Sequence, residues 1–299
     1  MPPQAEHGLG VCLQNYGSAM KRTLQDLVVS AFGAATSIAT AILLFLIEDS
    51  FGFSFYTWTF WFVIPVGAIL AGFIASGGYY LGARLFSHRP TPLILLNMVA
   101  ISVGTFFLVH FLSYVSLEID GKPVSDYVSF GTYLDIILRH QSVAFYLRGR
   151  ELGATGELGS WGYAYALLQI AGFAIGGIAV FVYLSSLPYC DKCSRYLSGR
   201  AKQERYAGDP GAFVQMVKEL AMAVDAGRLQ EAINQHAAIA EKKHQKELHL
   251  KSTLKLRKCR GCGKHWLGFS AGKWTGRDWK DINESEFSTF HEGELTLPG

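Results

Sequence analysis

Long apolar runs separated by short polar segments dominate the chain from residue 27 to Cys190. Four runs contain no Asp, Glu, Lys or Arg, and they cover residues 27–47, 50–83, 90–117 and 158–190. A helix needs roughly 20 residues to cross about 30 Å of hydrocarbon, and each run is long enough. Since lipid offers the backbone no hydrogen-bond partners, uncharged runs of this length predict transmembrane helices.

The predicted architecture is an integral membrane bundle of four α-helices that occupies residues 27–187. The expected spans are 27–47, 57–79, 92–115 and 162–186, and residues 1–26 form an N-terminal segment. Pro65 lies inside the second span and is expected to kink it, because proline removes a backbone donor and clashes one turn back. Aromatic residues near the ends of the second and fourth spans favour the same boundaries.

Charge is distributed unevenly and indicates an orientation. Residues 1–187 hold 8 basic and 10 acidic residues, whereas residues 188–299 hold 19 and 14. Basic residues flank the start of the first span, the joint between the second and third spans, and the end of the fourth. The positive-inside rule therefore predicts cytoplasmic N- and C-termini and an extracytoplasmic loop at 118–159. The expected location is a bacterial inner membrane or a plasma membrane.

The loop at 118–159 is too long to lack structure in a compact protein. Residues 131–147 are expected to form a helix in the membrane interface, with Asp135 and Arg139 paired one turn apart. A catalytic interpretation of Asp135, Arg139 and His140 stays open. Composition favours an interfacial helix with a solvated polar edge.

The predicted spans carry few groups suited to moving ions or protons. His110 is their only ionisable residue, and we expect it to be packed against its neighbours and bonded to a backbone carbonyl. Small residues recur four apart, for example at Gly172 and Gly176, and such rows let helices approach closely. They suit packing within one bundle or contact with a second copy, and we expect a homo-oligomer.

Two C-x-x-C pairs are the clearest chemical signal in the chain. They are Cys190–Cys193 and Cys259–Cys262, and together they supply the four thiolates of a closed tetrahedral zinc site. Around these cysteines and the glycines at 261 and 263, residues 188–275 resemble the zinc-ribbon group, which implies a structural, non-catalytic Zn²⁺. The stretch between the pairs, from residue 194 to residue 258, is longer than the usual ribbon spacing. Iron in the same cage, and redox thiols without metal, are the alternatives.

Residues 188–299 are thus expected to form a small cytoplasmic α+β zinc-ribbon-like domain with an inserted helical hairpin at 200–245. Asp209-Pro210 marks a helix start and Gly227 a helix stop. From residue 248 to 258 leucines alternate with polar and basic residues, which predicts a half-buried strand that leads into Cys259.

Residues 241–264 hold 9 basic residues against 2 acidic ones. Anionic lipid is one candidate partner, because the domain is tethered at the membrane. Nucleic acid is disfavoured since no stacking aromatics alternate with the lysines, although it stays open. The acidic residues of the C-terminal tail are a third way to neutralise this charge.

These patterns exclude several classes of protein and rank the rest. Only 17% of the residues are charged, against about 25% in a soluble domain, and no nucleotide-binding or nucleophile motif is present. The favoured function is a membrane scaffold, sensor or accessory subunit whose zinc domain binds a cytosolic protein or the membrane surface. The alternative is a small oligomeric channel or transporter gated by that domain. An enzyme is the third class and the least favoured.

Overall fold

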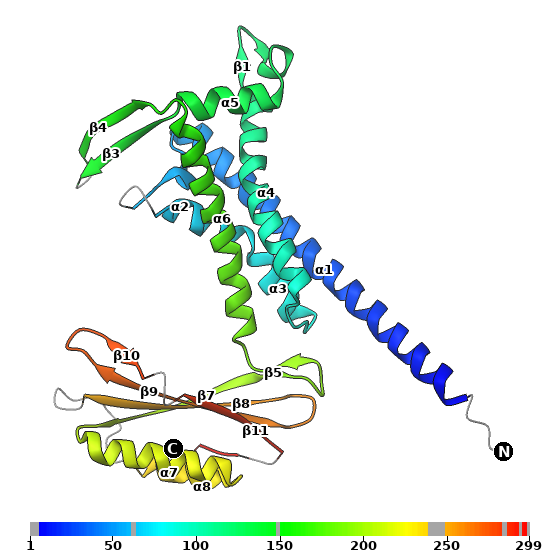
Figure 1. Ribbon diagram of the computed structural model, residues 1–299, viewed down its shortest axis with the longest axis vertical. Helices are drawn as coiled ribbons and strands as arrows, with labels where there is room; N and C mark the ends of the chain where they lie inside the picture. The colour runs from blue at the N-terminus through cyan, green and yellow to red at the C-terminus, as the bar shows by residue number, and fades with distance from the viewer. Residues whose placement is uncertain are drawn as a thin grey trace. The chain divides into compact units, whose positions relative to one another are not determined.

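The computed structural model describes residues 6–60, 64–147, 150–238, 249–282, 286–292 and 295–297, and the chain divides into two compact units (Figure 1). The first unit covers Met1–Ser186 and is mostly helical. The second covers Leu187–Gly299 and is rich in strands. Each unit is described by itself below.

Four helical segments of the first unit are long and apolar enough to cross a membrane: Thr23–Phe51, Val66–Leu85, Pro92–Ser116 and Trp161–Ser185. They belong to α1 (Glu6–Phe51), to the pair α2 (Val66–Ala75) and α3 (Gly77–Leu85), to α4 (Pro92–Ser116) and to α6 (Trp161–Ser185). The third and fourth agree with the predicted spans within one residue at each end. The first begins earlier than predicted, because α1 continues without interruption from residue 6.

The second predicted span, 57–79, is wrong in position. Residues Phe55–Thr57 form a short 3-10 turn, Phe60 pairs with Ile64, and helix α2 begins only after Pro65. Pro65 therefore precedes the helix and does not kink it, because a residue without an N–H is tolerated at a helix start. At the other end the helical path continues to Leu85, so Tyr79 is fully buried rather than at a boundary.

A break at Ser76 separates α2 from α3, and a side chain of α1 compensates for it. The Thr36 hydroxyl lies 2.7 Å from the carbonyl oxygen of Ala75 and accepts a hydrogen bond from the N–H of Gly78 at 3.0 Å. An interruption in an apolar helix is tolerated where a neighbour satisfies the freed backbone groups. This contact joins α1 to both halves of the broken helix.

Small residues set the spacing of α2 and α6. A Cβ at Gly72 would meet the backbone of Phe173, and one at Gly176 would meet the backbone of Ile69 and Phe73. Hydroxyls pair across other helix contacts, as between Ser37 and Thr105 (2.6 Å) and between Ser76 and Ser102 (2.7 Å). Large apolar side chains face outward on α1, α2, α4 and α6, which is the reverse of a soluble bundle.

The segment between α4 and α6 is folded. It contains the strands β1 (Glu118–Ile119) and β2 (Lys122–Pro123), a 3-10 turn η2 (Val124–Asp126), helix α5 (Phe130–His140), and the hairpin β3 (Ser142–Leu147) with β4 (Arg150–Glu157). Helix α5 contacts the ends of α4 and α6 (Figure 1). The predicted helix 131–147 is therefore too long: it ends at His140, because the residues that follow form β3 and pair with β4.

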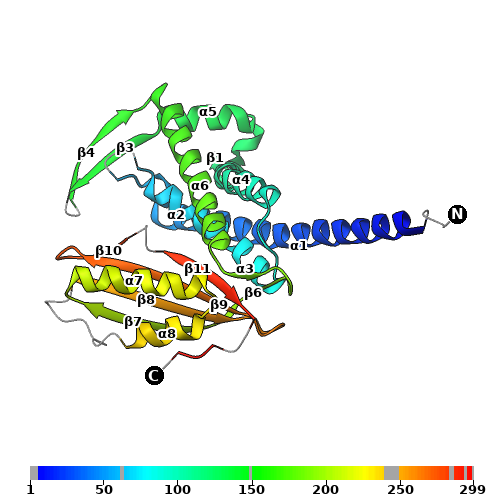
Figure 2. The ribbon, with the colours of Figure 1, turned by 60° about the horizontal axis from the view of Figure 1, so that its bottom comes forward.

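The second unit is an antiparallel sheet with a helical hairpin on one face (Figure 2). The central strands run in the order β7 (Ser198–Ala207), β8 (Leu250–Lys258) and β9 (His265–Trp274), and β10 (Trp279–Asp281) and β11 (Phe287–His291) both pair with β9. Helices α7 (Pro210–Asp225) and α8 (Leu229–Ala237) connect β7 to β8. The core lies between them and the sheet, with Leu254, Leu267 and Ile233 fully buried.

The predicted strand at 248–258 is confirmed over Leu250–Lys258, with leucines on the helix-facing side. Helix α7 begins at Pro210 and ends before Gly227, as predicted, and Gly227 has a φ of 73°. The predicted helical insertion at 200–245 is wrong at its start, because residues 198–207 pair with β8 along its whole length. Pairing satisfies the N–H and C=O groups that β8 would otherwise leave open. Residues 239–248 lie outside the described residues.

A buried polar network joins α8 to the sheet. His236 is fully buried, and its ring nitrogens lie 3.0 Å from the Gln203 side-chain oxygen and 2.9 Å from the Ser252 hydroxyl. Burial, aided by the charge of Arg205, lowers the pKa of His236 from its ordinary 6.5 to about 4. The imidazole is thus neutral in the fold and takes a proton more readily when the unit unfolds.

Replacing Gly176 by leucine should destabilise the helical unit, because the side chain has no room against the backbone of α2. Overpacking of this kind costs about 1–3 kcal/mol. Gly104→Leu is the matched control, since a Cβ at Gly104 meets nothing within 4 Å. Thermal unfolding of the detergent-solubilised protein should show a lower midpoint for Gly176→Leu only, and equal midpoints would contradict the close packing of α2 and α6.

Stability of the second unit should fall as the pH drops from 6.5 towards 4. In this window the unfolded histidine binds a proton and the buried His236 does not, which removes about 3 kcal/mol in total. Hydrogen exchange of the β8 amides in the full-length protein measures the effect. The fall in the free energy of exchange between pH 6.5 and 4 should be smaller in His236→Gln than in the parent protein. It should be unchanged in His249→Gln, which alters an exposed histidine.

Candidate metal centre

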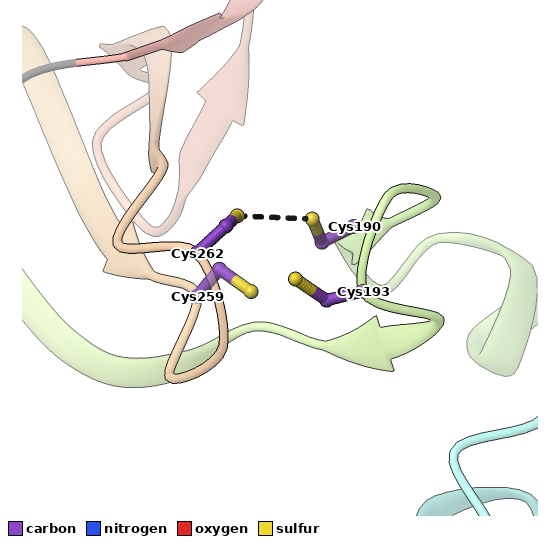
Figure 3. A group of neighbouring side chains, drawn as sticks. All are labelled: Cys190, Cys193, Cys259 and Cys262. Carbon is purple, nitrogen blue, oxygen red and sulfur yellow. Dashed lines mark hydrogen bonds between the residues drawn. The ribbon is translucent and has the colours of Figure 1, made fainter.

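The first cysteine pair lies on a short hairpin. Strands β5 (Tyr189–Cys190) and β6 (Arg195–Tyr196) pair antiparallel, and Cys193 lies in the turn between them. Ser194 has a φ of 47°, and its N–H donates to the carbonyl oxygen of Asp191 at 3.3 Å. The tight turn brings Cys190 and Cys193 to the same side of the hairpin (Figure 3).

The second pair lies in the turn that joins β8 to β9. The N–H of Cys259 donates to the carbonyl oxygen of Lys264 at 2.8 Å. The N–H of Gly263 donates to the carbonyl oxygen of Cys259 at 3.0 Å. Gly263 has a φ of 75°, a conformation that glycine adopts without strain. The turn thereby presents Cys259 and Cys262 toward the first hairpin (Figure 3).

The four sulfur atoms converge on one point. All lie within 4.8 Å of one another, and the Sγ atoms of Cys190 and Cys262 are 3.6 Å apart. A tetrahedral Zn²⁺ with Zn–S bonds of about 2.3 Å separates its sulfurs by about 3.8 Å. All four are free thiols, with Cys190 and Cys259 buried and the other two partly exposed. Four clustered cysteines of this kind can hold one metal ion.

Apolar contacts and a glycine shape the surroundings of the sulfurs. Leu197 is buried beside Cys190 and Cys259, and Trp266 packs against the same group. A Cβ at Gly261 would lie 2.8 Å from the sulfur of Cys193, so a larger residue would push into the cluster. Apolar packing thus covers Cys190 and Cys259, while Cys193 and Cys262 stay partly exposed.

The thiols also differ in acidity. Burial opposes ionisation of Cys259, but the backbone N–H groups of Cys262 and Gly261 bring the pKa of its thiol down to about 7. A hydrogen bond with Cys262, together with burial, raises the pKa of Cys193 to about 12. One sulfur is thus readily ionised while its neighbour holds a proton. A divalent cation would replace that proton and stabilise all four thiolates.

The cysteines predicted as ligands are therefore brought together from two turns that lie far apart in the sequence. The donor set fits Zn²⁺, and it also fits iron. Comparisons with protein families, with curated proteins and with solved structures find no match for this chain. The zinc-ribbon resemblance thus stays a prediction that rests on the four cysteines and the glycines at 261 and 263.

The other candidate residues, in the segment between α4 and α6, do not form a shared site. Asp135 pairs with Arg139 at 2.9 Å, as predicted, and the Tyr163 hydroxyl hydrogen-bonds to the same carboxylate. His140 lies 3.1 Å from Glu157 instead. All these groups are largely exposed and have separate partners, which disfavours the catalytic interpretation.

His110 is packed, but not bonded as expected. Its ring lies edge-on to Phe106 and Tyr56, and its Nε2 atom is buried with no hydrogen-bond partner among the described residues. The sequence analysis did not predict a contact of His88, which is also buried and lies 2.6 Å from the carboxylate of Asp26 on α1. Their separation of 62 positions left no local signal in the sequence.

The purified protein should contain about one tightly bound metal ion per chain. In Cys259→Ser the ion should be lost together with the fold of the second unit, because a structural Zn²⁺ contributes roughly 10–16 kcal/mol in comparable peptides. Elemental analysis and limited proteolysis measure the two effects. Cys12→Ser, which alters the cysteine outside the two pairs, should retain both the ion and the fold. Metal-free protein with an intact second unit would contradict the assignment.

Proposed function

We propose that this chain is an integral membrane protein that spans the bilayer four times and holds a zinc-stabilised domain in the cytoplasm. The apolar outer surface of the helical unit supports insertion, because lipid is the solvent that such a surface favours. Arg84 and Arg89 make the connection between α3 and α4 basic, and the second unit is basic too. By the positive-inside rule, both support cytoplasmic termini.

The function best supported is that of a membrane-anchored binding module, serving as a scaffold, sensor or accessory subunit. The observation that carries it is the tether: only residues 186–188 separate α6 from the hairpin that bears Cys190. A tether this short keeps the metal cage near the lipid surface. The domain is then placed to bind a cytosolic protein or the membrane surface itself.

Two features favour this function over the alternatives. The hydroxyls between helices bond to one another, as Ser37 does to Thr105, and so do not line an open path. Asp135 and His140 have separate partners, which disfavours an enzyme. A homo-oligomer formed through the small residues of the helices is part of the proposal, but the binding role does not depend on it.

Topology labelling tests the membrane arrangement. One cysteine is introduced at residue 120 or at residue 277 in a Cys12→Ser background, and the labelling of that background through Cys193 and Cys262 is subtracted. The two introduced cysteines should react on opposite sides of sealed vesicles. We expect the residue-277 probe to react only from the cytoplasmic face and the residue-120 probe only from the other. Labelling of both from one face would overturn the four-span arrangement.

Binding is tested separately. Cross-linking in intact cells should capture a cytosolic protein on the second unit, and the capture should fall at least tenfold in Cys259→Ser. Reconstituted liposomes should pass no ions. Steady currents through the reconstituted protein would favour the channel instead.

A further inference from the structure

A hollow of about 400 Å³ lies beside the cysteine cage, and lysines line it. Its walls include Lys192, Lys258 and Lys264, together with the single carboxylate of Glu292. We call it the knuckle hollow. All of its walls belong to the second unit, so its shape does not depend on how the two units are arranged.

The cysteine turns position these lysines. Lys192 lies between the two cysteines of the first hairpin, Lys258 ends β8 directly before Cys259, and Lys264 follows the second cysteine turn. Pairing of Ser198 with Lys258 brings the start of β7 alongside the end of β8. The same geometry that gathers four sulfurs therefore brings Lys192 to the same hollow as Lys258 and Lys264.

An anion is already held at this place. The Glu292 carboxylate lies 2.8 Å from the Lys264 ammonium, although the Glu292 side chain is 70% exposed. The hydrogen bond and charge of Lys264, followed by the charge of Lys192, lower the pKa of Glu292. Lys264 and Lys192 therefore favour a negative charge at the position of the Glu292 carboxylate.

We propose that the knuckle hollow binds a phosphate group, which displaces Glu292 from Lys264. Lysine ammonium groups arranged around a cavity bind phosphate oxygens through charge-assisted hydrogen bonds. The nearest phosphate is that of an anionic lipid headgroup, because Lys192 follows the end of α6 by seven residues, about 25 Å of extended chain at most. This source of phosphate rests on the proposed membrane function; the phosphate chemistry of the hollow does not.

A different role for the same lysines is to offset the charge of the metal cage. Four thiolates around a divalent ion carry a net charge of about −2, and Lys264 feels the charges of Cys262 and Cys190. The two roles predict different losses. Removing lysines that only offset charge weakens metal binding, whereas removing ligands of a phosphate weakens phosphate binding and leaves the metal in place.

The experiment uses the full-length, metal-loaded protein in non-ionic detergent. Titration calorimetry with inorganic phosphate forms one arm, and titration with dioctanoyl phosphatidylglycerol against dioctanoyl phosphatidylcholine forms the other. The test variant is Lys192→Gln with Lys258→Gln. The control, Lys218→Gln with Lys280→Gln, removes the same charge from exposed lysines outside the hollow. Metal content is measured for every sample.

We expect the test variant to bind at least about tenfold more weakly than the control in one or both arms, with metal content unchanged. Glu292→Gln should bind about threefold more tightly, since it removes the competing anion. If binding of inorganic phosphate weakens in the test variant, the hollow is a site for the free ion. If only the binding of phosphatidylglycerol weakens, the hollow is a site for the lipid headgroup.

Three results would overturn the proposal: no binding in either arm, equal weakening in the control, or loss of metal in the test variant. The phosphate arm needs no bilayer. It therefore keeps its meaning if topology labelling refutes the membrane arrangement.

Discussion

Hydrogen bonding of the backbone in apolar surroundings is the constraint on which the helical unit depends. A segment without charged residues has to satisfy each N–H and C=O within itself or through a close neighbour. Helices α4 and α6 do so over 25 residues each. Where the chain departs from this rule, at Ser76, the hydroxyl of Thr36 takes over the freed groups. The constraint thus explains both the long helices and the polar contacts between them.

In the second unit the comparable constraint is that the two cysteine turns have to bring their four sulfur atoms together. Its sheet has one helix-covered face and a modest core, and both cysteine turns lie at the end of β8 that leads into Cys259. A metal ion shared by the two turns would hold together segments that are distant in the sequence. The inserted segment shortens the effective distance, because β7 pairs with β8 and His236 of α8 lies 2.9 Å from Ser252 of β8. The long spacing is therefore compatible with a closed cage.

Basic charge in the second unit follows the placement of its cysteines. Lys192 lies within the first cysteine pair and Lys258 directly before the second, and both line one hollow because the cysteine turns meet. Part of the basic charge is neutralised by the chain itself, as in the pair of Lys264 with Glu292 and that of Lys202 with Glu204 (2.6 Å). Neutralisation by the acidic tail and attraction to an external anion are thus not exclusive. The carboxylate of Glu292 can yield its place to a phosphate.

The sequence by itself determined the features that depend on local periodicity and composition. The third and fourth apolar helices, the strand that ends before Cys259, the start of α7 and the four candidate ligands each follow from a pattern contained in one short segment. Tertiary structure decided the rest. Residues 198–207 became a strand because β8 offered a partner, and the second span moved because Pro65 suits a helix start. His88, between α3 and α4, met Asp26 of α1. These outcomes depend on which distant segments lie side by side, and local patterns carry no information about that.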